Sequence, residues 1–193
     1  MDQKNWSNQT YDDCKGQKNT IVSRNLYLDN IKKPKYKFQE TILFKKEKLN
    51  NKKAICIGLN PAKAEEKIDI TNIRLILLLW DKYDEYLLLN IFPEITDNKK
   101  QINYIDQENK LFEVKLIEVL NNTTDDIILF FGRTTIIPPN IVSCIKELFV
   151  KKRTIKLTAH YGEFTHPGSN ADINLIDYSS VFIRTDSVIR VKV

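Results

Sequence analysis

The sequence has few of the residues and patterns that mark specialised classes of protein. Its three cysteines, Cys14, Cys56 and Cys144, lie far apart without a CxxC pair, which argues against a four-thiolate zinc or iron–sulfur site. An odd cysteine count and an N-terminus without the apolar core of a signal peptide predict a cytoplasmic setting without disulfides. No apolar run approaches the roughly 20 residues of a membrane-spanning helix, so no membrane partner is expected.

The sequence also lacks the common catalytic signatures. It contains no Walker A loop and no GxGxxG, HExxH or GxSxG motif. With two histidines and no Cys–His pairing to assign, we expect no metal, no cofactor and no covalent intermediate. The 42% hydrophobic and 28% charged residues are typical of a globular domain, and the net charge of +5 suits nucleic acid or phosphorylated ligands without requiring them.

What is present is an alternation of strands and helices from residue 54 onward. Buried strands are predicted over residues 54–59, 86–91, 126–131 and 154–159. Helices are predicted over about 72–82, 104–121 and 140–151. Thr71 is expected to cap the first helix, and Pro138-Pro139 to open the third. Strands joined by helical crossovers predict a three-layer α/β/α fold with a central, mostly parallel four-stranded sheet.

The two ends of the chain are expected to differ from this core. Residues 1–20 are polar and aperiodic, which predicts loose order. Residues 21–48 alternate and are rich in β-formers, which predicts one or two strands or a hairpin beside the main sheet. The tail, 181–193, alternates and predicts a final strand. We therefore expect one domain over 1–193, with an N-terminal β-rich extension, 1–50, and an α/β core, 54–170.

Polar residues follow three of the predicted strands. Asn60 follows the first strand, Asn90 ends the second, and a short loop after the fourth leads to His166. Ligands of open α/β sheets bind outside the carboxyl ends of the parallel strands. We therefore expect two amides and an imidazole to converge on one crevice, with Gly58 allowing close approach of the backbone.

Each of these residues also has a structural interpretation. Asn60 could bond its own turn, Asn90 could tie two buried loops together, and His166 could lie at the surface. His160, at the strand end itself, competes with His166 for the same role. Elsewhere, Asp69 could bind a ligand or cation.

Two further sites carry the same ambiguity. Asp69 and Thr71 could instead form the N-terminus of the following helix. Arg133, which follows the third strand, either contacts phosphates or is an exposed arginine without a partner.

Taken in order, the motifs resemble those of the uracil-DNA glycosylase superfamily. The segments that carry the resemblance are Gly58-Leu59-Asn60-Pro61, Leu87-Leu88-Leu89-Asn90, Leu129-Phe130-Phe131-Gly132 and His166-Pro167-Gly168-Ser169. The first resembles the superfamily motif in its version with Asn, and the second the strand whose terminal Asn reads uracil. The third has Phe where the superfamily has the Trp of a "WG" element, and the fourth resembles an "HPS" loop with an inserted glycine.

The chain also resembles the DUF1643 family of uncharacterised bacterial and mobile-element proteins. That family's pattern is NP, D-x-T, N-L-F, WG and G-x-P-x-H-P. The corresponding segments here are Asn60-Pro61, Asp69-Ile70-Thr71, Asn90-Ile91-Phe92, Phe131-Gly132 and Gly162-Glu163-Phe164-Thr165-His166-Pro167. The resemblance covers roughly residues 54–170.

The superfamily resemblance implies hydrolysis of the N-glycosidic bond of deoxyuridine in DNA after base flipping. Asn90 would pair with the uracil edge, His166 would donate to O2 of the leaving base, and Asn60 would position water. The implied uracil site is completed by Gly58, Leu59 and Phe92. The implied DNA-backbone contacts are Pro61, Lys63, Arg133, Pro167 and Ser169. Superfamily enzymes usually stack an aromatic ring on the base soon after the first motif, but residues 62–76 contain no aromatic, and Ile68, Trp80 or Phe92 could substitute without the sequence deciding between them.

The implied partners are uracil-containing DNA, single- or double-stranded, and proteinaceous glycosylase inhibitors, with the protein itself expected to be a monomer. One alternative is a non-catalytic nucleic-acid or nucleotide-binding module of a mobile element. Another is a hydrolase of free nucleosides or modified bases, which predicts a closed pocket without a basic groove. A pure binder has no need of a water-positioning residue, so Asn60, Asn90 and His166 in one pocket would favour the enzyme.

Overall fold

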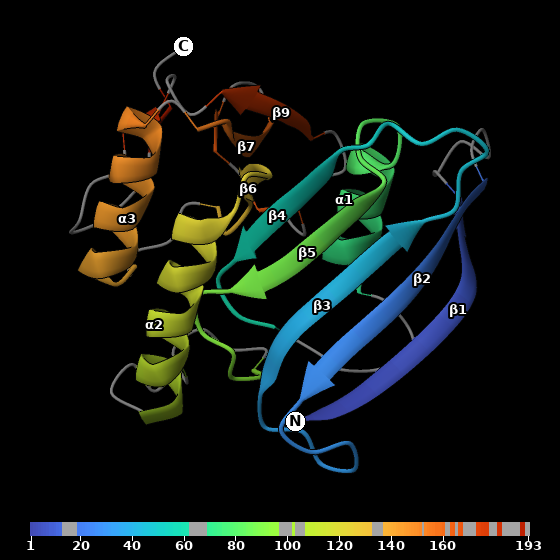
Figure 1. Cartoon of the computed structure of the whole chain (residues 1–193), viewed down its shortest axis with the longest axis horizontal. Coiled ribbons are helices and arrows are strands. Elements are labelled where there is room, and N and C mark those ends of the chain that lie inside the picture. The colour runs from blue at the N-terminus through green and yellow to red at the C-terminus, as the bar shows by residue number, and fades with distance from the viewer. Residues whose placement is uncertain are drawn as a thin grey trace.

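The core of the protein is a mixed β-sheet, which in the described residues has nine strands in the order β1-β2-β3-β5-β4-β6-β7-β8, with β9 also paired to β7 (Figure 1). The computed structural model describes residues 1–12, 19–61, 69–96, 102, 107–132, 137–151, 153–160, 163–164, 166–167, 173–177, 181–182 and 190–191. The main strands are β1 Asp2–Asp12, β2 Asn19–Leu28, β3 Lys37–Phe44, β4 Lys53–Gly58, β5 Glu85–Asn90, β6 Asp126–Leu129 and β7 Ile155–His160. The short ones are β8 Glu163–Phe164, β9 Asn174–Asp177, β10 Val181–Phe182 and β11 Arg190–Val191. The last two pair with each other in a separate two-stranded sheet.

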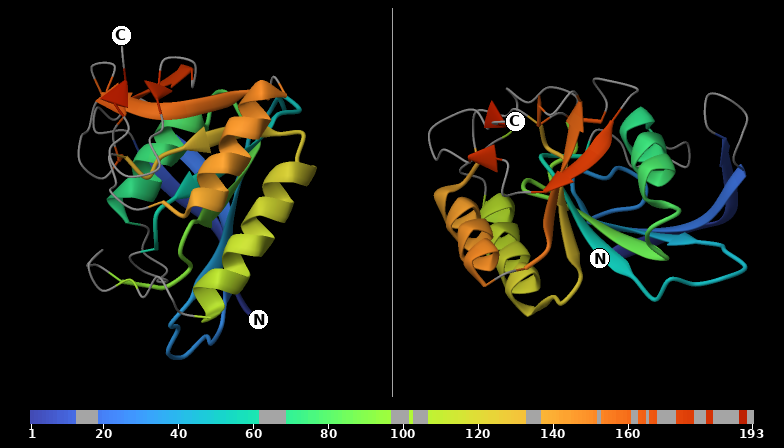
Figure 2. Two further views of the ribbon diagram at one scale, coloured as in Figure 1. Left: turned by 90° about the vertical axis from the view of Figure 1, so that its left-hand side faces the viewer. Right: turned by 90° about the horizontal axis from the view of Figure 1, so that it is seen from above.

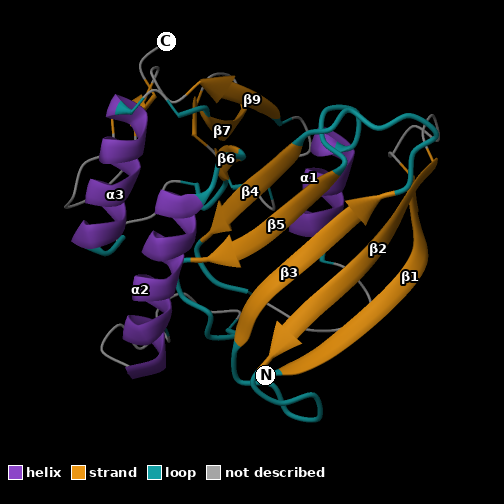
Figure 3. Cartoon of the chain, viewed as in Figure 1, coloured by secondary structure: helices purple, strands orange, loops and turns teal. Residues whose placement is uncertain are grey.

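The predicted architecture is wrong, because the sheet is larger and mixed. Strands β5, β4, β6 and β7 run parallel, but β3 pairs antiparallel with β5, and β2 and β1 continue the sheet beyond it. At the other end, β8 and β9 pair antiparallel with β7. The fold is strand-rich, with three helices in the described part, rather than a three-layer α/β/α fold around four parallel strands (Figure 3).

The N-terminal strands belong to the main sheet instead of lying beside it. Residues 2–12 form β1, where loose order was predicted. Along β2 the buried positions alternate strictly and include Arg24, and β3 buries Lys37 and Glu40. The strands predicted within residues 21–48 are present as β2 and β3, and they join the main sheet because β3 pairs with β5.

The helices are α1 Ile70–Leu79, α2 Gln107–Asn122 and α3 Pro139–Val150. Helix α1 lies on one side of the sheet, and α2 and α3 lie on the other (Figure 2). Ala54 and Cys56 of β4 pack with the cluster that contains α1, whereas Ile55 and Ile57 pack with the cluster that contains α2 and α3. Because β4 is buried on both faces, its sequence is apolar throughout.

Helix α1 begins two residues earlier than predicted, and Asp69 rather than Thr71 is its N-cap. The Asp69 carboxylate accepts a hydrogen bond from the backbone N–H of Asn72 at 3.0 Å. Helix α3 begins at Pro139, where a missing N–H costs no helical hydrogen bond. Within the described residues, no helix has the length and apolarity needed to cross a membrane.

Candidate functional site

A polar cavity of about 70 Å³ lies at the carboxyl ends of β4 and β5, on the side of the sheet that α1 covers. It offers several times the roughly 10–15 Å³ that one water molecule needs. Its lining residues are Lys37, Asn60, Pro61, Asp69, Thr71, Asn72, Leu88, Asn90, Phe130 and His166. The structure thus brings Asn60, Asn90 and His166 together, as the strand-end argument predicts.

Asn90 is the last residue of β5 and lies beside Gly58 in the parallel ladder. Its side chain is buried, at 4% exposure, yet its amide forms no hydrogen bond with any described residue. A Cβ on Gly58 would lie 2.5 Å from Asn90 Oδ1 and 2.5 Å from Cζ of Phe130. Gly58 is not among the lining residues. Because it has no side chain, the Asn90 amide and the Phe130 ring have room to line the cavity.

Asn60 is half-buried and held in a fixed orientation. Its Nδ2 donates to the Thr96 carbonyl at 2.7 Å and more weakly to the Pro61 carbonyl at 3.4 Å. Because backbone carbonyls accept from the Asn60 Nδ2 donor, the Asn60 Oδ1 acceptor is the group left for the cavity. That arrangement suits a group that orients a water molecule through an accepted hydrogen bond.

His166 is positioned by close packing at Gly132. Gly132 has φ +71°, and a Cβ there would lie 2.6 Å from the backbone nitrogen of His166. The imidazole lies 6.2 Å from the Phe130 ring between centroids. The next residue, Pro167, is tied to α1 because its carbonyl accepts from Arg74 Nη1 at 2.5 Å.

A buried ion cluster forms the wall of the cavity nearest β3. Glu40 accepts from Arg24 Nε at 2.7 Å, from Lys37 Nζ at 2.8 Å and from Asn72 Nδ2 at 3.2 Å. Burial acts to raise the pKa of Glu40, but the charges of Lys37 and Arg24 outweigh it and the pKa is lowered. Glu40 is therefore ionised at neutral pH, and the cluster is a salt bridge with a fixed geometry.

Asp69 and Thr71 lie at the N-terminus of α1, as one of their two interpretations predicts, and the binding role of Asp69 stays a prediction. Asp69 caps α1, and both residues line the cavity. Asp69 is the carboxylic acid in the lining, since Glu40 lies behind Lys37 and Asn72.

Four lining residues are missing from the sequence-based set: Lys37, Asn72, Leu88 and Phe130. Leu88 and Phe130 were detectable, because each lies on the cavity side of a predicted strand end. Phe130 is an aromatic residue in the lining. The sequence offers Ile68, Trp80 or Phe92 for the residue that stacks on the base. Lys37 and Asn72 carry no sequence signal, because each depends on the pairing of β3 with β5 and on contact with Glu40.

Several predicted residues lie away from the cavity. Leu59 and Phe92 pack in the core cluster that contains α2 and α3, and Trp80 packs around α1. His160 ends β7, and its side chain is outside what the structure describes. The predicted contacts Lys63, Arg133 and Ser169, and the candidate Ile68, also lie outside the described residues.

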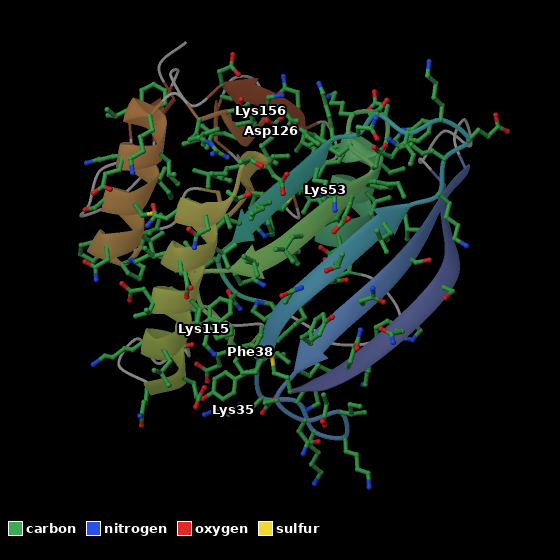
Figure 4. All side chains as sticks on the ribbon, in the orientation of Figure 1. Lys35, Phe38, Lys53, Lys115, Asp126 and Lys156 are labelled. Atoms are coloured by element: carbon green, nitrogen blue, oxygen red, sulfur yellow. The ribbon has the colours of Figure 1, made fainter. Side chains whose placement is uncertain are left out.

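A larger cavity, of about 310 Å³, lies at the opposite, amino end of the parallel strands. Its lining residues are Asn50, Lys52, Asp81, Lys82, Tyr83, Asp126 and Lys156. Figure 4 shows Asp126 and Lys156 close together and far from Lys35. Their ion pair spans 3.9 Å between side chains that are each 28% exposed, so it contributes no more than about 1 kcal/mol. This cavity holds none of the predicted site residues.

The smaller cavity lies at the carboxyl ends of parallel strands, and its lining side chains include both hydrogen-bond donors and acceptors. The chain belongs to the family described as protein of unknown function (DUF1643), whose model matches residues 41–168, about two thirds of the chain. This confirms the resemblance to that family. No curated protein and no solved structure matches the chain, so the comparisons give no link to uracil-DNA glycosylases.

Proposed function

We propose that this protein is a uracil-DNA glycosylase-like hydrolase that removes uracil from DNA. The observation that carries the proposal is that Asn60, Asn90 and His166 line one cavity, with Asn90 a buried residue whose amide has no hydrogen bond to any described residue. A buried asparagine that serves the fold is normally hydrogen-bonded. An asparagine kept free for a ligand is expected at a site that reads a base edge.

Base recognition would rest on Asn90 and Phe130. The Asn90 amide offers a donor pair and an acceptor, which match the edge of uracil and oppose that of cytosine. A mismatched buried polar group costs about 1–3 kcal/mol, which sets the scale of the discrimination. The Phe130 ring lines the same cavity and would stack on the extruded base, a contact worth about 1–3 kcal/mol per base.

The chemistry would divide among three side chains. The C1′–N1 bond breaks and its electron pair leaves with uracil, whose O2 takes up negative charge beside His166. Asn60 orients the attacking water, whose oxygen bonds to C1′. An amide cannot accept the water proton, so this role would fall to Asp69, the carboxylate in the lining.

Contact with DNA would come from the loop of residues 29–36, which connects β2 to β3 and which we call the lysine loop. Lys32, Lys33 and Lys35 are exposed there. The Lys35 carbonyl accepts from Ile95 N–H at 2.9 Å, next to the Thr96 carbonyl that holds Asn60. A basic loop beside the cavity favours a polymeric nucleic acid over a free nucleoside.

The test is cleavage of labelled uracil-containing oligonucleotides, single-stranded and paired with G or A, followed by alkali. We expect wild-type cleavage and a loss of about 100- to 1000-fold in Asn90→Ala and His166→Ala. Asn122→Ala, an exposed asparagine at the end of α2, is the matched control. An equal loss in His160→Ala would move the donor role from His166 to His160.

The absence of cleavage in every form of DNA would overturn the proposal. If the protein then still bound single-stranded DNA with a salt-dependent affinity, it would be the non-catalytic binding module. Removal of the three charges of the lysine loop should in that case make the slope of log K against log salt shallower, by about 0.7 for each DNA phosphate that a lysine neutralises.

A further inference from the structure

A buried lysine from outside the matched family segment lies in the wall of the cavity. Lys37 is the first residue of β3 and is 2% exposed, and the family match begins only at residue 41. Its backbone N–H donates to the Pro93 carbonyl at 2.8 Å, which fixes the start of the strand. Its ammonium donates to Glu40 at 2.8 Å, and Lys37 lines the cavity that Asn90 and His166 also line.

The ammonium has hydrogen-bonding capacity to spare. A lysine side chain carries three N–H donors. Glu40 takes one of them, and no other described residue accepts from Lys37. Buried polar groups are normally hydrogen-bonded, so a buried lysine that served only the fold would be expected to use more than one of its three N–H donors.

The buried cluster also carries a net positive charge. Arg24 and Lys37 contribute two cations and Glu40 one anion, all of them at 2% exposure or less. The Arg24 guanidinium lies over the Trp6 ring, 4.9 Å from its centroid, on the side away from Lys37 in the strand order. Lys37 is the cation of this cluster that lines the cavity.

Besides Lys37, the described lining includes the Asp69 carboxylate and the His166 imidazole, and Tyr86 lies near the cluster. Asp69 is half-exposed and lies at the positive end of α1, where it accepts from Asn72 N–H. Burial, and after it the charge of Glu40, raise the pKa of the Tyr86 hydroxyl, so that group stays neutral. His166, when neutral, donates without adding charge.

We infer that Lys37 stabilises the negative charge that develops on the leaving base, acting with His166 across the same cavity. This inference rests on the proposed function and names the residue that supplies its electrostatic part. A fixed cation in a site that excludes water stabilises a developing anion without reorganisation. The lysine would accelerate poor leaving groups more than good ones.

The kinetic test compares uracil with 5-fluorouracil in the same oligonucleotide. Lys37→Gln keeps a donor for Glu40 and removes the charge, and we expect it to slow uracil release by about 100-fold and 5-fluorouracil release by much less. Lys37→Arg should recover part of the rate. Lys33→Met, which changes an exposed lysine of the preceding lysine loop, is the matched control. An equal loss for both bases would show a structural role and overturn the inference.

A binding test separates this inference from the proposed reaction. The affinity of the wild-type protein for free 5-fluorouracil should rise as pH increases and the base ionises, and Lys37→Gln should lose that rise. Lys37 is the one residue that differs between the two proteins, so the difference between their pH profiles isolates its charge. A wild-type affinity that does not rise, or displacement of the base by inorganic phosphate, would overturn the inference. Base binding with this pH profile but no cleavage would refute the hydrolase and leave the role of Lys37 standing.

Discussion

Replacement of Asn90 by leucine should stabilise the protein while abolishing its activity. Asn90 is 4% exposed as a residue, and its amide has no hydrogen-bond partner among the described residues. A buried polar group without a partner costs about 1–3 kcal/mol. Some of its surface remains reachable by water in the cavity, so we take the lower end and expect Asn90→Leu to raise the free energy of unfolding by about 1 kcal/mol.

The matched control is Asn72→Leu, because Asn72 has the same 4% exposure but donates to Glu40 at 3.2 Å. This change should lower the free energy of unfolding by about 1–3 kcal/mol. Leucine is a better helix former than asparagine by roughly a few tenths of a kcal/mol. The measured loss in the free energy of unfolding is therefore slightly smaller than the contribution of the hydrogen bond. Two asparagines of equal burial thus give changes of opposite sign.

The assay is urea unfolding of both variants, with cleavage of a uracil oligonucleotide measured on the same preparations. If Asn90→Leu destabilised the protein as much as Asn72→Leu, Asn90 would be serving the fold. The reasoning that assigns it to a ligand would then be refuted. A stable variant with full activity would refute the assignment equally.

Two further perturbations test the geometry and the charge of the site. Gly58→Ala would place a Cβ 2.5 Å from Asn90 Oδ1, and a displacement of about 1 Å should cost roughly 100-fold in kcat/KM. Ala54→Val, a buried enlargement at the other end of β4, should cost about 1–3 kcal/mol of stability without that loss, and equal activity in both variants would contradict the geometry. Glu40→Gln should cost about 3–5 kcal/mol at neutral pH, because it leaves two buried cations without their carboxylate. Burial alone would raise the pKa of Glu40, but Lys37 and Arg24 hold it below its ordinary 4.5, so its stabilisation is complete above that pH and is lost as pH falls through the lowered value. The free energy of unfolding should therefore depend less on pH below about 4.5 in the variant than in the wild type, and parallel pH curves would contradict the salt bridge.

The four parallel strands β4, β5, β6 and β7 could be predicted from the sequence because they are continuous apolar runs, whereas β8 and β9, which pair antiparallel with β7, were not predicted. Strands β4 and β5 were located to within a residue, and the strand-end rule placed Asn60 and Asn90 at one cavity. Helix ends were less accurate, since Asp69 and Thr71 are both able to cap and only the backbone geometry decides between them.

The N-terminal strands could not be predicted in the same way. Periodicity arguments assign charged residues to the surface, but Arg24, Lys37 and Glu40 are mutually paired inside. Their pairing depends on contacts between positions far apart in the chain, which no local window contains. For the same reason, Lys37 could not be predicted as a residue of the candidate site.

The pairing of β3 with β5 has a consequence for how the molecule can be divided. The family match begins at residue 41, in the middle of β3, which runs from Lys37 to Phe44. A fragment cut at that boundary would keep Thr41 opposite Leu87 but lose Glu40 and everything before it. It would remove the Glu40 partner of Asn72 and one of the four pairs between β3 and β5. The rest of β3 would lose its neighbour β2 and become a sheet edge, which is a template for aggregation with other chains. The smallest unit able to fold on its own therefore starts upstream of the family boundary, within the N-terminal strands.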